Sequence, residues 1–286
     1  MPIDPSTAIG AELPEMKCSW SASDVLLYHL GLGAGSETTN PRELRYTYER
    51  DLQVLPTFGV VAPNLWATQP PSVSFPGVDI DLTKVLHGRQ EITLHRPLPV
   101  HGSARVRTRI ADVYDKGTAA VIVQESEAVD TEDNALFTAR SSIFARGEGG
   151  FGGHRGRSGT MPVPDREPDA VLLSPTLPQQ ALLYRLCGDR NPLHADPDFA
   201  AAAGFPRPIL HGLCTYGMVC KAVVDGLLDG DTSRVSSYSA RFAGVVYPGE
   251  TLRTRVWHED GHLMLTTSVL ERDDELALSD AVLTVH

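Results

Sequence analysis

The segment "HGLCTYGMVCKAVVDGLL", residues 211–228, constrains the fold most, because it predicts a helix that is apolar around nearly its whole circumference. Only Lys221 and Asp225 interrupt the apolar surface. Such a helix must be covered on most of its sides, and it is shorter than the roughly 20 residues that span a membrane. An antiparallel sheet that curves around the helix satisfies both conditions.

The rest of the chain predicts two halves with the same order of elements. Each half opens with a helical segment, "SASDVLLYHLGLGAG" or "LPQQALLYRLCG", and closes with strands separated by polar turns such as DKG, EDN and EDG. The segments "LPVHGSARVRTRI" and "VVYPGETLRTRVW" nearly superimpose. We therefore expect an internal duplication with an α+β architecture, in which two antiparallel sheets are each associated with helices. The first half has no apolar helix as clear as 211–228.

A Gly-, Pro- and charge-rich segment that starts at Gly147 separates the two halves. We expect an N-terminal domain at 1–146, a linker at 147–170 and a C-terminal domain at 171–286.

Composition limits the class of protein. The chain has 286 residues, 42% of them apolar, as in a folded globular protein. Its net charge of −11 disfavours nucleic-acid binding. It begins without the pattern of a signal peptide and contains no apolar run long enough to span a membrane. The four cysteines have no CxxC spacing, so we expect buried reduced thiols in a cytoplasmic protein.

The loop "GDRNPLH" concentrates polar chemistry in a few positions. Asp189 can accept a proton from water, and His194, five residues later, can hold the same water across a tight loop. Gly188 permits a sharp exit from the preceding helix, and Pro192 stiffens the loop. Asn191 can contact a substrate or fix the loop by binding backbone groups.

A second feature lies at "PRPILHG", where the buried helix begins. The N-terminus of a helix presents unpaired N–H groups and positive partial charge. Because Gly212 has no side chain, an oxygen that becomes negatively charged during a reaction can approach its N–H. The position of His211 at the helix start is explained by a structural role.

The loop resembles the signature of the R-specific enoyl-CoA hydratases, also called hydratase 2, of the MaoC-like dehydratase family. The pattern is aromatic-x-aliphatic-small-Gly-Asp-x-Asn-Pro-aliphatic-His, followed by a small residue. Its residues here are Tyr184, Leu186, Cys187, Gly188, Asp189, Asn191, Pro192, Leu193, His194 and Ala200. The segments "SDVLLYHLGLGAG", "LPTFGVV" and "RFAGVVYPGETL" extend the resemblance over nearly the whole chain.

The resemblance implies a double hot-dog fold and reversible hydration of trans-2-enoyl-CoA to (R)-3-hydroxyacyl-CoA. It implies that Asp189 and His194 are the catalytic pair, that Gly212 supplies the oxyanion hole, and that Tyr184 supports the loop. The N-terminal half has no catalytic loop, and the resemblance implies that it accommodates the acyl chain in a tunnel.

The acyl-CoA thioester is the expected partner, and coenzyme A enters only as part of it, so no other cofactor is expected. Arg190, Arg207 and Arg241 are candidates for contacts to the coenzyme A phosphates, or are simply solvated. "HADPD" and His211 lack paired metal-ligand spacing, so no metal is expected. The chain is expected to be a monomer or a homodimer.

Three alternatives remain open from the sequence. The first is a 3-hydroxyacyl-ACP dehydratase of fatty-acid synthesis, and the second is a hydratase for branched or steroid side-chain CoA thioesters. The third is an acyl-thioester binder without catalytic activity.

Overall fold

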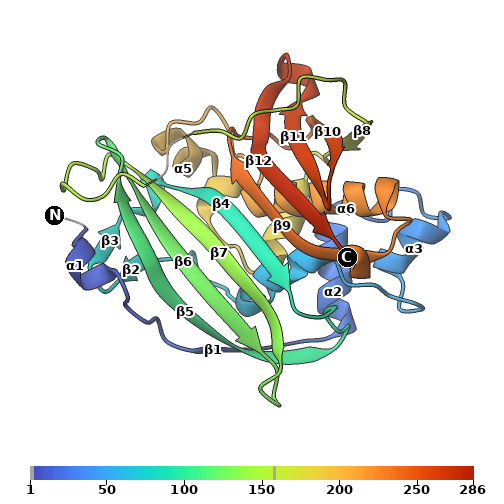
Figure 1. The fold of residues 1–286 in the computed structure, drawn as a ribbon, viewed down its shortest axis with the longest axis horizontal. Coiled ribbons are helices and arrows are strands. Elements are labelled where there is room, and N and C mark those ends of the chain that lie inside the picture. The colour runs from blue at the N-terminus through green and yellow to red at the C-terminus, as the bar shows by residue number, and fades with distance from the viewer. Residues whose placement is uncertain (1–2, 157–158) are drawn as a thin grey trace.

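The computed structural model of the protein describes residues 3–156 and 159–286, and its main feature is one antiparallel sheet of ten strands (Figure 1). The strand order is β1-β5-β6-β7-β4-β9-β12-β11-β10-β8. The bounds are β1 Met16–Trp20, β4 Val85–Leu94, β5 Gly102–Asp115, β6 Ala119–Val129, β7 Ala135–Arg146, β8 Ala170–Pro175, β9 Val235–Phe242, β10 Thr251–Glu259, β11 His262–Val269 and β12 Glu275–Val285. A separate hairpin is formed by β2 Val73–Phe75 and β3 Val78–Ile80.

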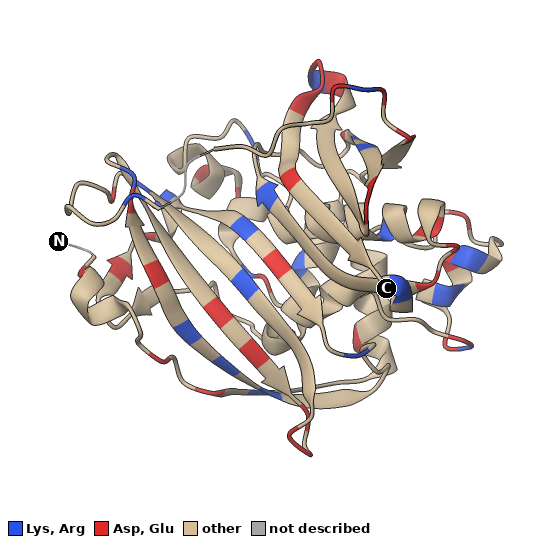
Figure 2. Cartoon of the chain, in the orientation of Figure 1, with Lys and Arg blue, Asp and Glu red and all other residues tan. Residues whose placement is uncertain are grey.

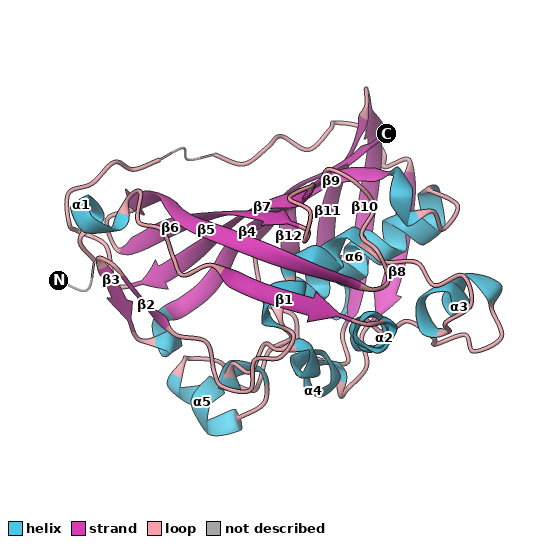
Figure 3. Ribbon diagram, turned by 90° about the horizontal axis from the view of Figure 1, so that it is seen from below, coloured by secondary structure: helices cyan, strands magenta, loops and turns pink. Residues whose placement is uncertain are grey.

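The helices lie mainly on one side of this sheet (Figure 3). They are α1 Pro5–Ala8, α2 Ala22–Gly31, α3 Pro41–Thr47, α4 Gln180–Tyr184, α5 Pro197–Ala202 and α6 Gly212–Leu227. Charged residues recur at alternate positions in parts of β4, β5 and β6 (Figure 2), as is typical of a sheet with one solvated face.

The expectation of two separate sheets is wrong, because β4 and β9 pair with each other and join the halves. Their register runs from Arg89 opposite Arg241 to Thr93 opposite Ser237. Unpaired, each strand would present an open edge of backbone N–H and C=O groups. The pairing satisfies both edges and leaves one continuous double hot-dog sheet.

The sheet order supports the expected duplication. We call the pairing of β4 with β9 the β4–β9 seam. At equal distances from this seam in the sheet order, β7 matches β12, β6 matches β11, β5 matches β10 and β1 matches β8. The two segments that nearly superimpose in sequence lie largely in β5 and β10, which are therefore equivalent positions in the two halves.

The apolar helix predicted at 211–228 is present as α6 and lies at the centre of the core. Tyr216, Val219, Cys220 and Val223 are fully buried. Tyr216 donates a hydrogen bond to the Tyr238 carbonyl oxygen at 2.6 Å, which ties the helix to β9. The main apolar cluster includes residues from both halves, so the halves share one core.

The two polar interruptions of α6 are explained by α3. Lys221 Nζ lies 2.7 Å from Glu43 Oε1 and 2.8 Å from Asp225 Oδ2. Tyr46 donates a hydrogen bond to Asp225 Oδ1 at 2.8 Å, and its ring lies below the ammonium group of Lys221. The polar positions therefore fasten α3 to the central helix.

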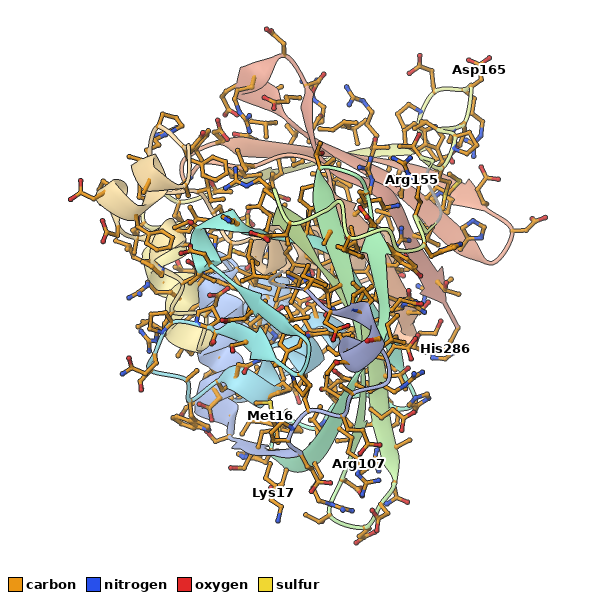
Figure 4. All side chains as sticks on the ribbon, turned by 90° about the vertical axis from the view of Figure 1, so that its left-hand side faces the viewer. Met16, Lys17, Arg107, Arg155, Asp165 and His286 are labelled. Atoms are coloured by element: carbon orange, nitrogen blue, oxygen red, sulfur yellow. The ribbon has the colours of Figure 1, made fainter. Side chains whose placement is uncertain are left out.

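The linker passes along the side of the sheet opposite to α2, α4 and α6 (Figure 3). Asp280 on β12 accepts a hydrogen bond from Met161 N at 2.6 Å, and Trp257 Nε1 donates to the Arg166 carbonyl oxygen at 3.0 Å. Arg155 and Asp165, also in this segment, are labelled in Figure 4.

All four cysteines are buried and free, as expected. No helix in the described residues is long and apolar enough to cross a membrane.

Candidate active site

The sharp exit after α4 depends on Gly188. A short 3-10 helix, Arg185–Cys187, follows α4, and Gly188 then adopts a left-handed conformation with φ of 103°. A Cβ atom added there would lie 1.8 Å from the Asn64 carbonyl oxygen. Only glycine fits this turn, which directs the chain into the polar loop.

Asp189 and Asn191 fix the loop through their side chains. Asp189 Oδ1 accepts a hydrogen bond from Asn191 N at 3.1 Å. Asn191 Oδ1 accepts one from Leu193 N at 3.0 Å and so caps the 3-10 helix Pro192–His194. The loop therefore carries His194 back toward Asp189, and Asn191 also lines the cavity described below.

His194 is oriented by the backbone. Its Nδ1 lies 2.9 Å from the Ile209 carbonyl oxygen, which accepts the Nδ1 proton and leaves Nε2 with a free lone pair. The side chain is buried, with 8% exposure. Burial lowers the pKa of His194 below its ordinary value, although the charge of Asp189 opposes this effect. The imidazole is therefore neutral and able to accept a proton at neutral pH.

His211 packs against His194, a contact that the sequence did not indicate. Its ring stacks on that of His194 with centroids 3.8 Å apart, and the ring of Tyr184 lies 5.0 Å away on another side. His211 Nε2 is 3.4 Å from the Asp189 carbonyl oxygen. Burial and His194 lower the pKa of His211 well below its usual value. The uncharged stack holds the loop against the start of α6.

Asp189, His194 and His211 place three possible metal-ligand atoms within 4.8 Å of one another. The two imidazoles, however, stack at an interplanar angle of 29°. Lone pairs in nearly parallel ring planes do not converge on one point, as the tetrahedral site preferred by zinc requires. This geometry does not suit a zinc ion held by all three side chains.

Gly212 is the first residue of α6, at the end where the helix N–H groups are unpaired. Among the described residues, none accepts a hydrogen bond from Gly212 N. A Cβ atom at this position would lie 3.0 Å from the ring of Phe242, so a side chain would crowd the approach.

One cavity of about 690 Å³ contains Asp189, His194 and Gly212 and continues into the N-terminal half. It reaches the inner faces of β4, β5, β6 and β7 and the β2–β3 hairpin. Met16, which is labelled in Figure 4 and belongs to the edge strand β1, also lines the cavity. The N-terminal half has a short 3-10 helix, Pro56–Val60, where the C-terminal half has α6, and the cavity extends into this half.

The three arginines have other partners. Arg190 Nε donates to the Ala67 carbonyl oxygen at 3.2 Å, and the guanidinium of Arg207 lies 4.6 Å from the centre of the Tyr247 ring. Arg241 Nε is 2.8 Å from Asp280 Oδ2. Because side chains alternate along β9 and Phe242 faces the cavity, Arg241 faces the opposite side of the sheet. That position does not fit a coenzyme A contact at the cavity.

Fold and site define a double hot-dog protein with a carboxylate–imidazole pair at the start of its central helix. Residues 19–147 match the family model described as "MFE-2 hydratase 2 N-terminal domain", and residues 160–278 match "MaoC like domain". The chain belongs to the MaoC-like dehydratase family and has its two-domain, hydratase 2 form.

Three similar proteins match this chain over nearly their full length. The enoyl-CoA hydratase ChsH3 of Mycobacterium tuberculosis is 58% identical, with 98% of each chain covered. The 3-hydroxyacyl-thioester dehydratase Y of the same organism is 43% identical over 96% of this chain and 94% of its own. The crystal structure of a MaoC-like dehydratase from Phytophthora capsici superimposes with a TM-score of 0.88 at 28% identity, covering 99% and 98% of the two chains.

Proposed function

We propose that this protein is a hydro-lyase that reversibly hydrates trans-2-enoyl-CoA to (R)-3-hydroxyacyl-CoA. The observation that carries the proposal is the meeting of Asp189, His194 and the Gly212 N–H in one deep cavity. The names of the relatives, an enoyl-CoA hydratase and a 3-hydroxyacyl-thioester dehydratase, support the same reaction in its two directions. The R configuration rests on the family alone.

The acid–base chemistry uses one water held between Asp189 and Nε2 of His194. The water oxygen bonds to C3 of the enoyl group while the pair takes up one water proton. The electron pair of the C2–C3 double bond moves toward the thioester and forms an enolate. A proton from the pair then goes to C2, which completes the addition of water and returns Asp189 and His194 to their starting protonation states.

The enolate oxygen is held by the start of α6. The N–H of Gly212 donates to it, and the positive end of the helix dipole stabilises its charge. A single donor of this kind contributes about 3 kcal/mol to stabilising a transition state.

The domain roles follow from this chemistry. We propose that 171–286 is the catalytic domain, that 1–146 accommodates the acyl group, and that 147–170 is the linker. Coenzyme A enters as part of the substrate, and the reaction needs no metal. We further propose a cytoplasmic enzyme that works as a monomer or a homodimer.

A second candidate is the dehydration of 3-hydroxyacyl groups attached to acyl carrier protein. It is favoured by the relative named as a 3-hydroxyacyl-thioester dehydratase. The same residues would perform the reverse reaction, so a comparison of the two carriers distinguishes the candidates. A higher kcat/KM with acyl carrier protein thioesters would favour the second candidate.

The test is turnover of trans-2-enoyl-CoA thioesters of several lengths, followed by the loss of conjugated absorbance. The product is trapped with an R- or S-specific 3-hydroxyacyl-CoA dehydrogenase. Asp189→Asn and His194→Gln should each lower kcat about 100-fold or more. Asp198→Asn, on the exposed side of α5, serves as the control and should retain full activity. Binding of enoyl-CoA without turnover by the wild-type protein would contradict the proposal.

A further inference from the structure

The inner face of the sheet in the N-terminal half carries an unexpected row of polar side chains. Side chains at alternate positions of a strand share one face, and on β4 to β7 the cavity lining mixes polar with apolar residues. Among the polar ones are Gln90 on β4, Ser141 on β7 and Gln124 on β6. We refer to these three residues as the polar row.

Strand register makes the polar row continuous. Gln90 pairs with Ser141, and Ser141 pairs with Gln124, so the three side chains are direct neighbours across three strands. With strands roughly 4.8 Å apart, the row is about 10 Å long. The next positions on one side are Ile122, Ile143 and His87, and those on the other side are Ser126, Ala139 and Ile92.

The groups of the polar row are only partly satisfied by the protein. Gln90 Nε2 donates to the Glu91 carbonyl oxygen at 2.9 Å. In the part of the chain that the structure describes, the side chains of Gln124 and Ser141 have no hydrogen-bond partner. The neighbouring Thr108 and Ser126, in contrast, bind each other at 2.8 Å. The polar row therefore offers donors and acceptors to whatever occupies the cavity.

A plain alkyl chain is a poor occupant of this part of the cavity. Amide and hydroxyl groups that are buried against hydrocarbon lose their hydrogen bonds to water without replacement, which is unfavourable. The described lining residues include no lysine or arginine, so a carboxylate would find no cation. Two amides and a hydroxyl match a neutral oxygen that can accept or donate hydrogen bonds.

The polar row begins on β4, the strand that also carries a residue beside the thioester site. The ring of His87 on β4 is 4.7 Å from that of Phe242, which in turn borders Gly212. Gln90 is three positions along the same strand, and the polar row continues from it away from β9. An acyl group that starts at the thioester site and extends toward β7 and β6 therefore passes along the polar row.

We propose that the preferred acyl group carries a hydroxyl or carbonyl oxygen far from the thioester, and that Gln90, Ser141 and Gln124 bind this oxygen. The inference rests on the hydratase function proposed above and specifies its substrate class. The three are specificity-determining residues and take no part in the hydration chemistry.

The experiment compares three thioesters of equal chain length. They are trans-2-decenoyl-CoA, 10-hydroxy-trans-2-decenoyl-CoA and 9-oxo-trans-2-decenoyl-CoA. The wild-type protein should hydrate at least one oxygenated substrate with a kcat/KM about 10-fold above that of the plain chain, the effect expected of a satisfied hydrogen bond. Gln124→Leu should remove this preference by raising kcat/KM for the plain chain and lowering it for the oxygenated one.

Two further variants control the result. Ser141→Ala, a smaller change in the same row, should lower the preference in the same direction. Ile143→Val, which lines the cavity on the same face of β7, should change all three substrates alike. Equal kcat/KM values for the three substrates with wild-type protein would overturn the inference while leaving the hydratase function intact. The same holds for a preference that both polar-row variants retain. Failure to hydrate any of the three would instead contradict the proposed function, and with it the inference.

Discussion

At the scale of single residues, Gly188 has the least freedom to change. Its positive φ and the nearby Asn64 carbonyl exclude any side chain. We expect Gly188→Ala to lower the free energy of unfolding by about 3 kcal/mol and to reduce kcat, because the loop that carries Asp189 must shift. Thermal unfolding and steady-state kinetics measure the two effects.

Gly204 provides the matched control for this change. It also has a positive φ, 87°, but a Cβ atom there meets nothing within 4 Å. Gly204→Ala should therefore cost only about 1 kcal/mol and leave kcat unchanged. Equal losses in the two variants would show that backbone strain, and not the clash with Asn64, explains the requirement at Gly188.

The decrease of kcat/KM at low pH should be set by the protonation of His194. Burial lowers its pKa, so the neutral form that can accept a proton persists below pH 6.5. We expect kcat/KM for enoyl-CoA to stay constant as pH falls to 6.5 and to decline only at lower pH. A decline centred above pH 6.5 would contradict this account of the site.

The sequence predicted those site residues whose roles are local. Gly188, Asn191 and Pro192 shape a turn within a few positions, so their residue types reveal their roles. The stacking of His211 on His194 and the polar row depend on contacts between distant segments. No local sequence pattern predicts these contacts. In the sequence, Gln124 and Ser141 are indistinguishable from other polar residues of the predicted strands.

At the scale of elements, the ion pairs of α6 should be important for stability. Lys221 is 12% exposed and balances Glu43 and Asp225. Lys221→Ala leaves two partly buried carboxylates without their cation, so we expect a loss of about 2 kcal/mol in the free energy of unfolding by urea. Lys17→Ala, at an exposed position of β1, should change it by about 0.5 kcal/mol or less. A triple change of Lys221 to Met, Glu43 to Gln and Asp225 to Asn should recover part of the loss.

His29 on α2 should make the fold sensitive to acid. It is fully buried and neutral, with Nδ1 3.0 Å from the Tyr46 carbonyl oxygen and Nε2 accepting from Leu55 N at 3.3 Å. Burial lowers its pKa to about 3, from 6.5. The unfolded chain therefore binds a proton that the folded chain excludes, and stability is lost as pH falls from 6.5 toward 3.

This contribution amounts to about 1.4 kcal/mol per pH unit within that window. Urea unfolding at several pH values measures the slope. His29→Gln keeps a polar side chain without the titration, so its slope should be shallower by that amount. An unchanged slope would assign the acid sensitivity to other groups.

The elements themselves were largely predictable, and their assembly was not. Alternation and turn residues predicted the strands, and the continuous apolar surface predicted α6, because both signals are local. The pairing of β4 with β9 joins residues about 150 positions apart in the chain, as in Arg89 opposite Arg241, so the single sheet could not be predicted.

At the scale of the whole molecule, the two halves should depend on each other. Separation would expose the edges of β4 and β9 and part of the shared core, and would break the hydrogen bond from Gln180 Nε2 to the Gly31 carbonyl oxygen. We expect residues 1–146 and 147–286, expressed separately, to lack cooperative unfolding by circular dichroism. Expressed together, they should form an active complex. Independent folding of either half would contradict the view of one shared core.

The β4–β9 seam also has an evolutionary consequence. It joins the half that we propose to be catalytic to a second half that we propose only accommodates the acyl group. Substitutions in the N-terminal copy can therefore alter which molecules are accepted while the reacting groups stay untouched. Substrate specificity can in this way change through substitutions in one half of the gene, while the reaction itself stays the same.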